Sequence, residues 1–477
     1  MSPRSIDRRL RTRQRTAWKP ARLPEIKPLL EATDNGHPVV VPAQRFASPR
    51  SGSDWGPYAE TFLRLNEEAF KALGARGQVV GTSFGQSVQI VPGARAGAIP
   101  LKSAVTDRVA GGLLVRSRFG WNGIGRLLCE TGWHASPQLL PLATVPGSAR
   151  EVPAWVLAGP ILARLERLLK GLRPGYTELE TTLLKPRGRI LWESYVTGSL
   201  VHGRWERLPC RFPDLSKDPV LRRYIRWTLE SVLLDLHRAG RLDPVAQELA
   251  ELANLLIRQV VDVLPLAPRR DDLRRGRAAG LLSKEVYLGL EAMMWVIDER
   301  GLGGGNERDG LSWALSLDGL WEHYVESVYR REAASTGGEV FAGRLGQTLF
   351  PLHWTDPMHR TLGHLIPDLM VRRGSSVNVV DAKYKAHLAE VDEVGWNRFE
   401  DEIRDSHRSD IHQVLAYASL YEADDITATL VYPLRLKTYL SLRDKGHDRS
   451  YADLMHGGRT IRLELRGLPF GSPHAPH

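Results

Sequence analysis

Two short apolar runs on either side of a glycine-containing turn constrain the fold of this chain most strongly. Leu365–Arg372 and Val377–Tyr384 are rich in apolar and β-branched residues, the composition of β-strands. Gly374 lies at the first central position of the intervening two-residue loop, where a type II′ turn needs a residue that accepts positive φ. The sequence therefore predicts a β-hairpin within residues 364–385.

The predicted turn places two acidic residues opposite each other. A loop centred between Gly374 and Ser375 pairs Asp368 with Asp381, with Cβ atoms about 5 Å apart. A divalent cation between the carboxylates would convert their repulsion into ligation, and Mg²⁺ prefers carboxylate and water oxygens. Lys383 shares a strand face with Asp381 and could orient a water or stabilise phosphate charge. An ordinary hairpin with surface charges is the alternative.

Pro367-Asp368 followed by Asp381-Ala382-Lys383 resembles the signature of the PD-(D/E)xK nuclease superfamily. The resemblance implies that Asp368 and Asp381 bind Mg²⁺, with Mn²⁺ as a possible substitute. It also implies that Lys383 assists the attacking water. The carbonyl of Ala382 is a further candidate metal ligand.

A helix is predicted over Asp318–Glu332, with Asp318 as its N-cap. Glu322 lies one turn into this helix, where the resemblance implies a glutamate that completes the metal shell. The alternative is a first-turn glutamate favoured only by the helix dipole. Glu326, one turn later, is the substitute candidate.

A second helix is predicted over Ser409–Tyr421, capped by Ser409. Gln413 and Tyr417 are four residues apart and share a helix face, so they could orient the lysine, the water or the scissile phosphate. Strands are predicted at Glu339–Phe341, Gln347–Trp354 and Ile426–Tyr432. The order of helix, strands, hairpin, helix and strand is the one that the nuclease resemblance implies.

Gln413-x-x-x-Tyr417 resembles the QxxxY motif of RecB-like nucleases, and a wider set of stretches resembles the McrC family, the nuclease subunits of McrBC-type restriction systems. The matching stretches are Leu320–Val325, Pro367-Asp368, Val380–Lys385 and Asp410–Ala418. The resemblance implies a partner, a hexameric AAA+ NTPase (McrB-like) that moves DNA, and an oligomeric state set by that partner. No Walker A sequence is present, so any motor must come from another chain.

The predicted fold class is multidomain α+β, with a C-terminal α/β core of the PD-(D/E)xK, restriction-endonuclease-like type. The expected units are a basic disordered arm at 1–22, a mixed β domain for partner or DNA docking at 23–150, a helical middle domain at 151–305 and the nuclease domain at 306–477. The last boundary is placed at the glycine-rich linker Gly301–Asn306.

Two basic clusters in the upstream half have open interpretations. Lys185, Arg187 and Arg189 surround Gly188 and could bind phosphates or the γ-phosphate of a partner NTPase, or form an ordinary surface turn. The aromatic and basic stretch around Phe119 suits base stacking or a protein interface, and a core role is favoured. This second cluster contains Arg116, Arg118, Trp121 and Arg126.

Composition restricts the class of partner and the compartment. The chain has 477 residues and a formal net charge of +10, which favours a polyanionic partner such as DNA. Its two cysteines exclude a disulfide framework, a four-cysteine zinc site and an iron–sulfur cluster made by this chain alone. They fit a reducing cytosol. No apolar run approaches the ~20 residues of a membrane span, so a cytoplasmic protein without a membrane partner is expected.

These features together predict a Mg²⁺-dependent DNA endonuclease subunit of a prokaryotic defence system. Two alternatives remain open from the sequence. One is a stand-alone RecB-like DNA repair nuclease that needs no motor. The other is a non-catalytic adaptor that docks DNA to a motor, although an adaptor would have no need of the two acids and the lysine together.

Overall fold

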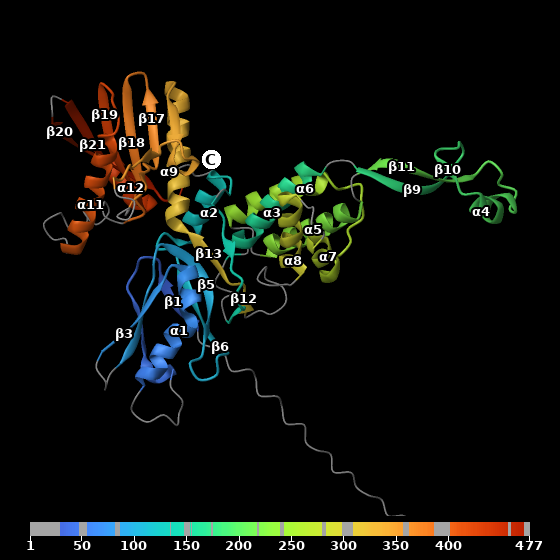
Figure 1. Cartoon of the computed structure of the whole chain (residues 1–477), viewed down its shortest axis with the longest axis horizontal. Coiled ribbons are helices and arrows are strands. Elements are labelled where there is room, and N and C mark those ends of the chain that lie inside the picture. Colours follow the sequence, from blue (N-terminus) through green and yellow to red (C-terminus); the bar gives the residue numbers. More distant parts are fainter. Residues whose placement is uncertain are drawn as a thin grey trace, which may run out of the picture.

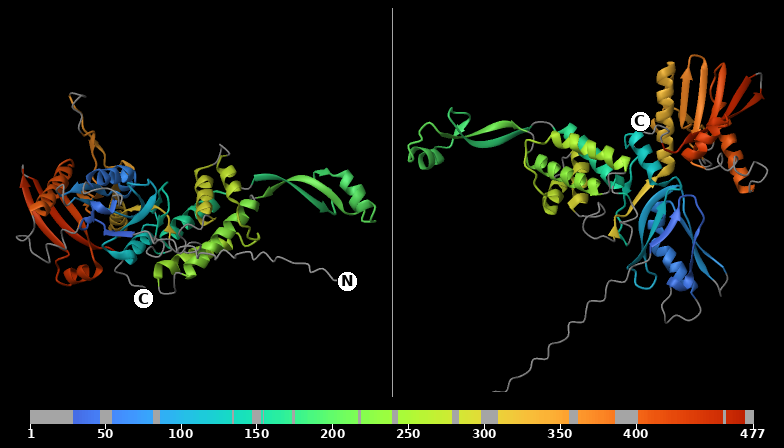
Figure 2. Two further views of the ribbon diagram at one scale, coloured as in Figure 1. Left: turned by 90° about the horizontal axis from the view of Figure 1, so that it is seen from below. Right: turned by 180° about the vertical axis from the view of Figure 1, so that it is seen from behind.

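The computed structural model has a mixed α/β architecture with several sheets (Figures 1 and 2). It describes residues 29–46, 55–81, 86–133, 135–146, 153, 155–172, 175–216, 219–238, 243–278, 283–297, 309–355, 362–385, 401–456 and 459–471. The predicted arm at 1–22 and the predicted linker Gly301–Asn306 lie outside the described residues. No described helix is both long and apolar enough to cross a membrane.

The N-terminal part contains two small sheets with helix α1 packed against them. Its elements are β1 (Leu29–Thr33), β2 (Val39–Pro42), η1 (Ala43–Phe46), α1 (Gly56–Leu73), β3 (Arg76–Val80), β4 (Ser87–Val91), β5 (Arg95–Lys102), β6 (Val109–Arg116), α2 (Gly120–Glu130), β7 (Gln138–Leu139) and β8 (Val145–Pro146). Phe62 and Phe70 of α1 pack with Ile99 and Leu113 of the larger sheet. The order of that sheet is β1-β6-β5-β13-β7, where β13 (Trp313–Ser316) lies after the boundary expected at 306.

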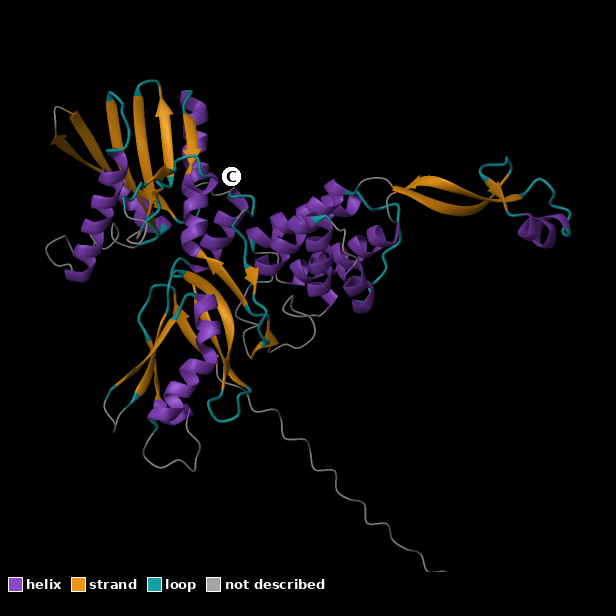
Figure 3. Ribbon diagram, in the orientation of Figure 1, coloured by secondary structure: helices purple, strands orange, loops and turns teal. Residues whose placement is uncertain are grey.

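A helical bundle follows in the chain (Figure 3). Its helices are α3 (Trp155–Gly171), α5 (Pro219–Arg238), α6 (Pro244–Arg258), α7 (Arg270–Ala278) and α8 (Lys284–Ile297). Leu165, Leu229 and Leu249 are buried in its core, as the helical spacing of the apolar residues predicts.

A β-structured arm extends away from this bundle (Figure 1), so the segment at 151–305, predicted to be a helical middle domain, also contains three strands among its described residues. Its elements are β9 (Gly175–Leu183), β10 (Arg189–Ile190), α4 (Trp192–Ser194), η2 (Tyr195–Leu200) and β11 (Leu208–Ser216). Strand β11 pairs with both β9 and β10. The arm was not predicted from the sequence because the segments on either side have helical periodicity. The threonine-rich stretch Thr177–Leu183 nevertheless has the β-branched composition of a strand.

The C-terminal part contains a six-stranded mixed sheet, with helices on both of its faces, and short strands that pair outside this sheet. Its elements are β12 (Asp309–Gly310), α9 (Leu317–Thr336), β14 (Glu339–Ala342), η3 (Gly343–Leu345), β15 (Phe350–Pro351), β16 (His364–Leu365), β17 (Leu369–Arg373), β18 (Ser376–Ala382), α11 (Asp401–Ala418), β19 (Asp425–Leu434), α12 (Leu436–Asp444), β20 (Arg449–His456) and β21 (Arg459–Pro469). The strand order is β14-β17-β18-β19-β21-β20. Val380 packs in the cluster that contains α9, whereas Val379 packs against α11, so alternate residues of β18 face different helices.

The predicted hairpin is confirmed in its turn and its register. Leu369 pairs with Val380 and Arg373 with Ser376, so the loop has two residues. Gly374 has φ +59°, the positive value that the turn requires of it. The pairing ends at Leu369 and Val380, so Asp368 and Asp381 are the next residues beyond the last pair of this register.

Three local expectations were wrong. Helix α9 is capped by Ser316, whose hydroxyl accepts the backbone N–H of Gly319 at 3.1 Å, and not by Asp318. Helix α11 begins at Asp401, so Ser409 lies inside it; residues 401–408 are polar and lack the apolar period that marks a helix. The strand expected over Gln347–Trp354 is reduced to Phe350–Pro351.

Candidate active site

The two acids of the hairpin meet where β17 begins and β18 ends. Asp381 is the second-last residue of β18 and is only 2% exposed. Asp368 directly precedes β17, and its Oδ2 accepts the backbone N–H of Ala382 at 2.8 Å. This hydrogen bond fixes one oxygen of Asp368 at the end of β18.

Burial and neighbouring acids both affect the pKa of Asp368. Burial raises the pKa of this carboxyl well above its usual range, and the negative charges of Asp381 and Glu322 raise it further. The N–H of Ala382 opposes this shift. A carboxyl whose ionised form is disfavoured by neighbouring carboxylates is a group that a bound cation would stabilise.

Lys383 lies beside the acid pair and is held from two sides. Its Nζ is 2.7 Å from Oδ2 of Asp381 and donates to Oε1 of Gln413 at 2.9 Å. Burial lowers the pKa of Lys383, but the charge and hydrogen bond of Asp381, together with the charges of Asp410 and Asp368, outweigh burial and raise the pKa. The side chain is therefore an ammonium at neutral pH, suited to binding negative charge and unsuited to accepting a proton.

Helix α11 supplies the residues that hold the lysine. Gln413 donates from Nε2 to the hydroxyl of Tyr417 at 2.9 Å, which fixes the amide so that its oxygen faces Lys383. The spacing of four residues puts both side chains on one helix face, as the sequence predicts. The structure thus brings Asp368, Asp381 and Lys383 together with Gln413 and Tyr417.

Glu322 approaches the same strand end from the other side of the sheet. The preceding residue, Trp321, donates from Nε1 to the carbonyl of Val431 at 3.2 Å, and Val431 is the sheet partner of Ala382. Burial raises the pKa of Glu322 to about 7, and the charges of Asp318 and Asp381 add to the shift while Lys383 opposes it. The pKa of Glu322 is therefore affected by the charge of Asp381, and the pKa of Asp368 is affected by the charge of Glu322.

Glu326, the substitute candidate, is engaged elsewhere. Its carboxylate pairs with Arg330 at 2.7 Å and with Arg344 at 2.5 Å. Among the described residues, no group of three His, Cys, Asp or Glu side chains is already arranged as a metal site. A cation here would rest on the Asp368–Asp381 pair, with Glu322 approaching only by a side-chain movement.

Two charged residues of the site were missed from the sequence. Asp410 is 4% exposed, and its Oδ1 lies 2.7 Å from Nζ of Lys385 and 3.9 Å from Nζ of Lys383. A sequence signal existed for both. Asp410 precedes Gln413 by three residues on the same helix, and Lys385 continues the alternation of Asp381 and Lys383.

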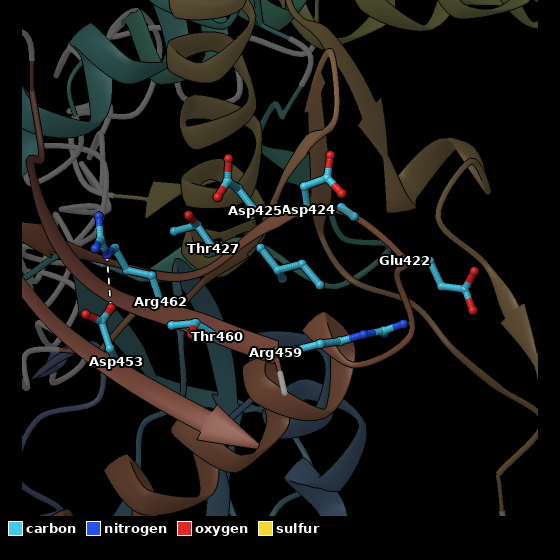
Figure 4. Close-up of a pocket in the computed structure, with 10 residues that line it drawn as sticks. Glu422, Asp424, Asp425, Thr427, Asp453, Arg459, Thr460 and Arg462 are labelled. Carbon is cyan, nitrogen blue, oxygen red and sulfur yellow. Dashed lines mark hydrogen bonds and ion pairs between the residues drawn. The ribbon is translucent and has the colours of Figure 1, made fainter. Parts of the chain in front are cut away.

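A separate open hollow lies at the other end of β19 (Figure 4). It is lined by exposed acids, including Asp424 and Asp425, and by Arg462, which pairs with Asp453 at 3.0 Å. Asp381 pairs with Leu430, toward the opposite end of β19 from Asp425. The hollow is therefore distinct from the acid pair.

A family model of a restriction system matches the chain. The family model described as "McrBC 5-methylcytosine restriction system component" matches residues 149–433, more than half of the chain. The chain belongs to this family. No curated protein matches it in sequence.

Two solved structures from Thermococcus gammatolerans are similar to the chain. One is a half-complex from a tetradecameric assembly of McrB AAA+ hexamers with bound McrC. It has 14% identity and a TM-score of 0.40, and the match covers 94% of this chain and 96% of that one. The other is a cryo-EM structure of the McrBC complex, with 12% identity and a TM-score of 0.28, and the match covers 64% of this chain and 87% of that one.

Proposed function

We propose that the chain is the Mg²⁺-dependent DNA endonuclease subunit of its restriction system, with a PD-(D/E)xK core. The observation that carries the proposal is the convergence of Asp368, Asp381 and Lys383 at one end of the sheet. These residue types suit phosphodiester hydrolysis, because two carboxylates can hold a divalent cation and an ammonium can stabilise the charge on the phosphate.

The acid pair fits Mg²⁺ in its donor chemistry. Mg²⁺ is commonly bound through one or two carboxylates and keeps several waters, and the pair offers two carboxylates with few other protein ligands. Asp368 and Asp381 would hold the ion, with Glu322 and the Ala382 carbonyl as further ligands and Mn²⁺ as a substitute. When bound, the ion would neutralise charge on the phosphate and lower the pKa of a bound water.

The protein's own groups would orient the reactants. Lys383 is held by Gln413, so its ammonium would remain in place when Asp381 turns to a cation. From there it would donate hydrogen bonds to the attacking water or to a phosphate oxygen. Tyr417 would act through Gln413 by fixing the direction of its amide.

We further propose that the chain works with a separate AAA+ NTPase, and that the arm docks on it. The tip of the arm exposes large apolar side chains, including Trp192 at 62% and Trp205 at 69% exposed. Exposed tryptophans close together on a projecting element are typical of a protein interface. Arg187 stacks on Phe212 at 4.1 Å, so among the basic residues of the turn Lys185 and Arg189 are the better candidates for phosphate contacts.

The proposal is tested by plasmid cleavage with the purified chain, with and without its AAA+ partner and NTP, on methylated and unmethylated DNA. Cleavage by wild type that Asp381→Asn abolishes is expected. The matched control is Asp424→Asn, an exposed acid at the far end of the same sheet, which should leave cleavage unchanged.

The same assay separates the alternatives. Cleavage of linear DNA without partner or NTP would favour a stand-alone nuclease. Cleavage that survives Asp381→Asn would contradict the assigned site. Stimulation of the partner's NTPase by a chain that never cuts DNA would favour an adaptor.

A further inference from the structure

The N-terminal sheet meets the candidate active site at the ends of two parallel strands. Strands β1 and β6 pair in parallel, so Asp34 and Arg118, which follow them, emerge side by side. The side chain of Asp34 has no solvent exposure. Its Oδ1 accepts the backbone N–H of Arg118 at 2.6 Å, and its Oδ2 lies 3.6 Å from Nε of the same residue. Both the backbone and the side chain of Arg118 are therefore fixed by one buried carboxylate.

From this anchor, Arg118 reaches into the C-terminal part. Its Nη2 donates to the carbonyl of Tyr384 at 3.1 Å. Its guanidinium also lies over the Tyr384 ring, 4.7 Å from the centroid. An arginine that both donates to a carbonyl and stacks on the ring of the same residue fixes that residue in position and in orientation.

Tyr384 is the residue next to the catalytic lysine. Strand β18 ends at Ala382, and the N–H of Lys383 makes one further bond, to the carbonyl of Val431 at 2.9 Å. Besides the ion pair of Lys385 with Asp410, the direction in which the chain leaves Lys383 depends on what holds Tyr384. Arg118 provides that hold from the N-terminal part of the molecule.

Aromatic side chains also pack at this junction, which is the contact region between the N-terminal part and the end of β18. Phe119 stacks on Phe470 at 4.3 Å, and Phe470 lies 5.8 Å from the ring of Tyr384 and 5.9 Å from that of Trp321. Trp321 directly precedes Glu322. One aromatic cluster thus contacts the neighbours in sequence of both Lys383 and Glu322, so a shift at the junction would reach both groups.

We propose that Arg118, fixed by Asp34, is a positioning residue for Lys383. The inference rests on the proposed nuclease function and deepens it, because it makes the N-terminal part a component of the active site's geometry. A rotation of the N-terminal sheet against the C-terminal sheet would move Tyr384 and, through it, the lysine.

The test compares Arg118→Gln and Arg118→Lys with the control Arg331→Gln in the full chain with its partner. Arg331 of α9 pairs with Glu130 of α2 at 3.3 Å, so the control removes an ion pair between the same two parts and leaves the contacts of Arg118 with Tyr384 in place. Arg118→Gln should lower kcat for DNA cleavage by roughly 10-fold or more at unchanged KM, since small misplacements of a catalytic group are costly. Arg118→Lys should recover part of kcat, and Arg331→Gln should match wild type.

A second readout does not depend on cleavage. Hydrogen–deuterium exchange of a peptide spanning residues 380–385 should be faster in Arg118→Gln than in wild type and unchanged in Arg331→Gln. If wild type does not cleave DNA, the nuclease proposal fails and the exchange data still decide the positioning role. Exchange and kcat equal to wild type in Arg118→Gln, or an equal loss of kcat in Arg331→Gln, would overturn the inference.

Discussion

The ammonium of Lys383 lies 2.7 Å from the carboxylate of Asp381, two residues earlier in the chain. This contact neutralises one charge of the acid pair and leaves Asp368 with a raised pKa beside it. A divalent cation would compete with the lysine for Asp381, and Gln413 would then hold the lysine. Under the proposed function, this contact would link cation binding to the placement of the ammonium.

Removing either member of this contact should abolish cleavage. Asp381→Ala removes a proposed ligand, and Lys383→Ala removes the ammonium that would stabilise phosphate charge. Each should lower plasmid cleavage by about 100-fold or more, as loss of a preorganised electrostatic group does. Thermal unfolding checks that both variants remain folded, and cleavage that persists in either one would refute its assigned role.

Glu326→Gln should weaken the fold and spare the chemistry. The substitution removes the charge that Arg330 and Arg344 share, and we expect a loss of about 1–2 kcal/mol in the free energy of unfolding, because both guanidiniums remain partly in water. Chemical denaturation measures this loss, and cleavage per folded molecule should match wild type. A variant of normal stability that fails to cut DNA would instead assign Glu326 to the site.

The raised pKa of Glu322 predicts that the effect of Mg²⁺ on stability depends on pH. In the folded protein the pKa of Glu322 is about 7, whereas in the unfolded chain the pKa of this carboxyl has its ordinary value of 4.5. The stabilising contribution of that proton is complete below the lower value and is lost as pH rises through the higher one. Since a cation binds the ionised form, Mg²⁺ should raise Tm more at about pH 8 than at about pH 5.5.

Glu322→Gln provides the control for this prediction. The variant cannot ionise at this position, so the part of the pH dependence that belongs to Glu322 should disappear from its Tm. A Mg²⁺ effect on Tm that varies with pH equally in wild type and Glu322→Gln would show that another group titrates.

The arm should be needed for partner binding and not for folding. Replacing both Trp192 and Trp205 by alanine removes exposed apolar surface and leaves the buried core intact. Tm should change little, and binding to the AAA+ partner should weaken by at least about 100-fold if these tryptophans are interface anchors. Light-scattering or sedimentation measurements of the complex test this, and unchanged assembly would exclude the arm tip as the docking element.

Local patterns determined what could be predicted from the sequence. The hairpin register followed from one glycine turn and strand alternation, and both depend on neighbouring residues. The i, i+4 spacing of Gln413 and Tyr417 placed them on one helix face for the same reason. The arm was missed because its strands lie between long helical periods.

Contacts between distant parts of the chain could not be predicted in the same way. Arg118 and Tyr384 are 266 residues apart, and no local pattern indicates that they meet. Asp410 has a sequence signal, but its importance depends on the packing of α11 against β18, which brings it to Lys385. Tertiary packing, and not propensity, decides such contacts.

Binding of Mn²⁺, followed by electron paramagnetic resonance in the full-length chain, tests the central claim most directly. The account predicts one bound Mn²⁺ per wild-type chain, lost in Asp368→Asn and in Asp381→Asn and retained in Asp424→Asn. Equal Mn²⁺ binding by all four proteins, or none by any of them, would contradict a metal site between Asp368 and Asp381.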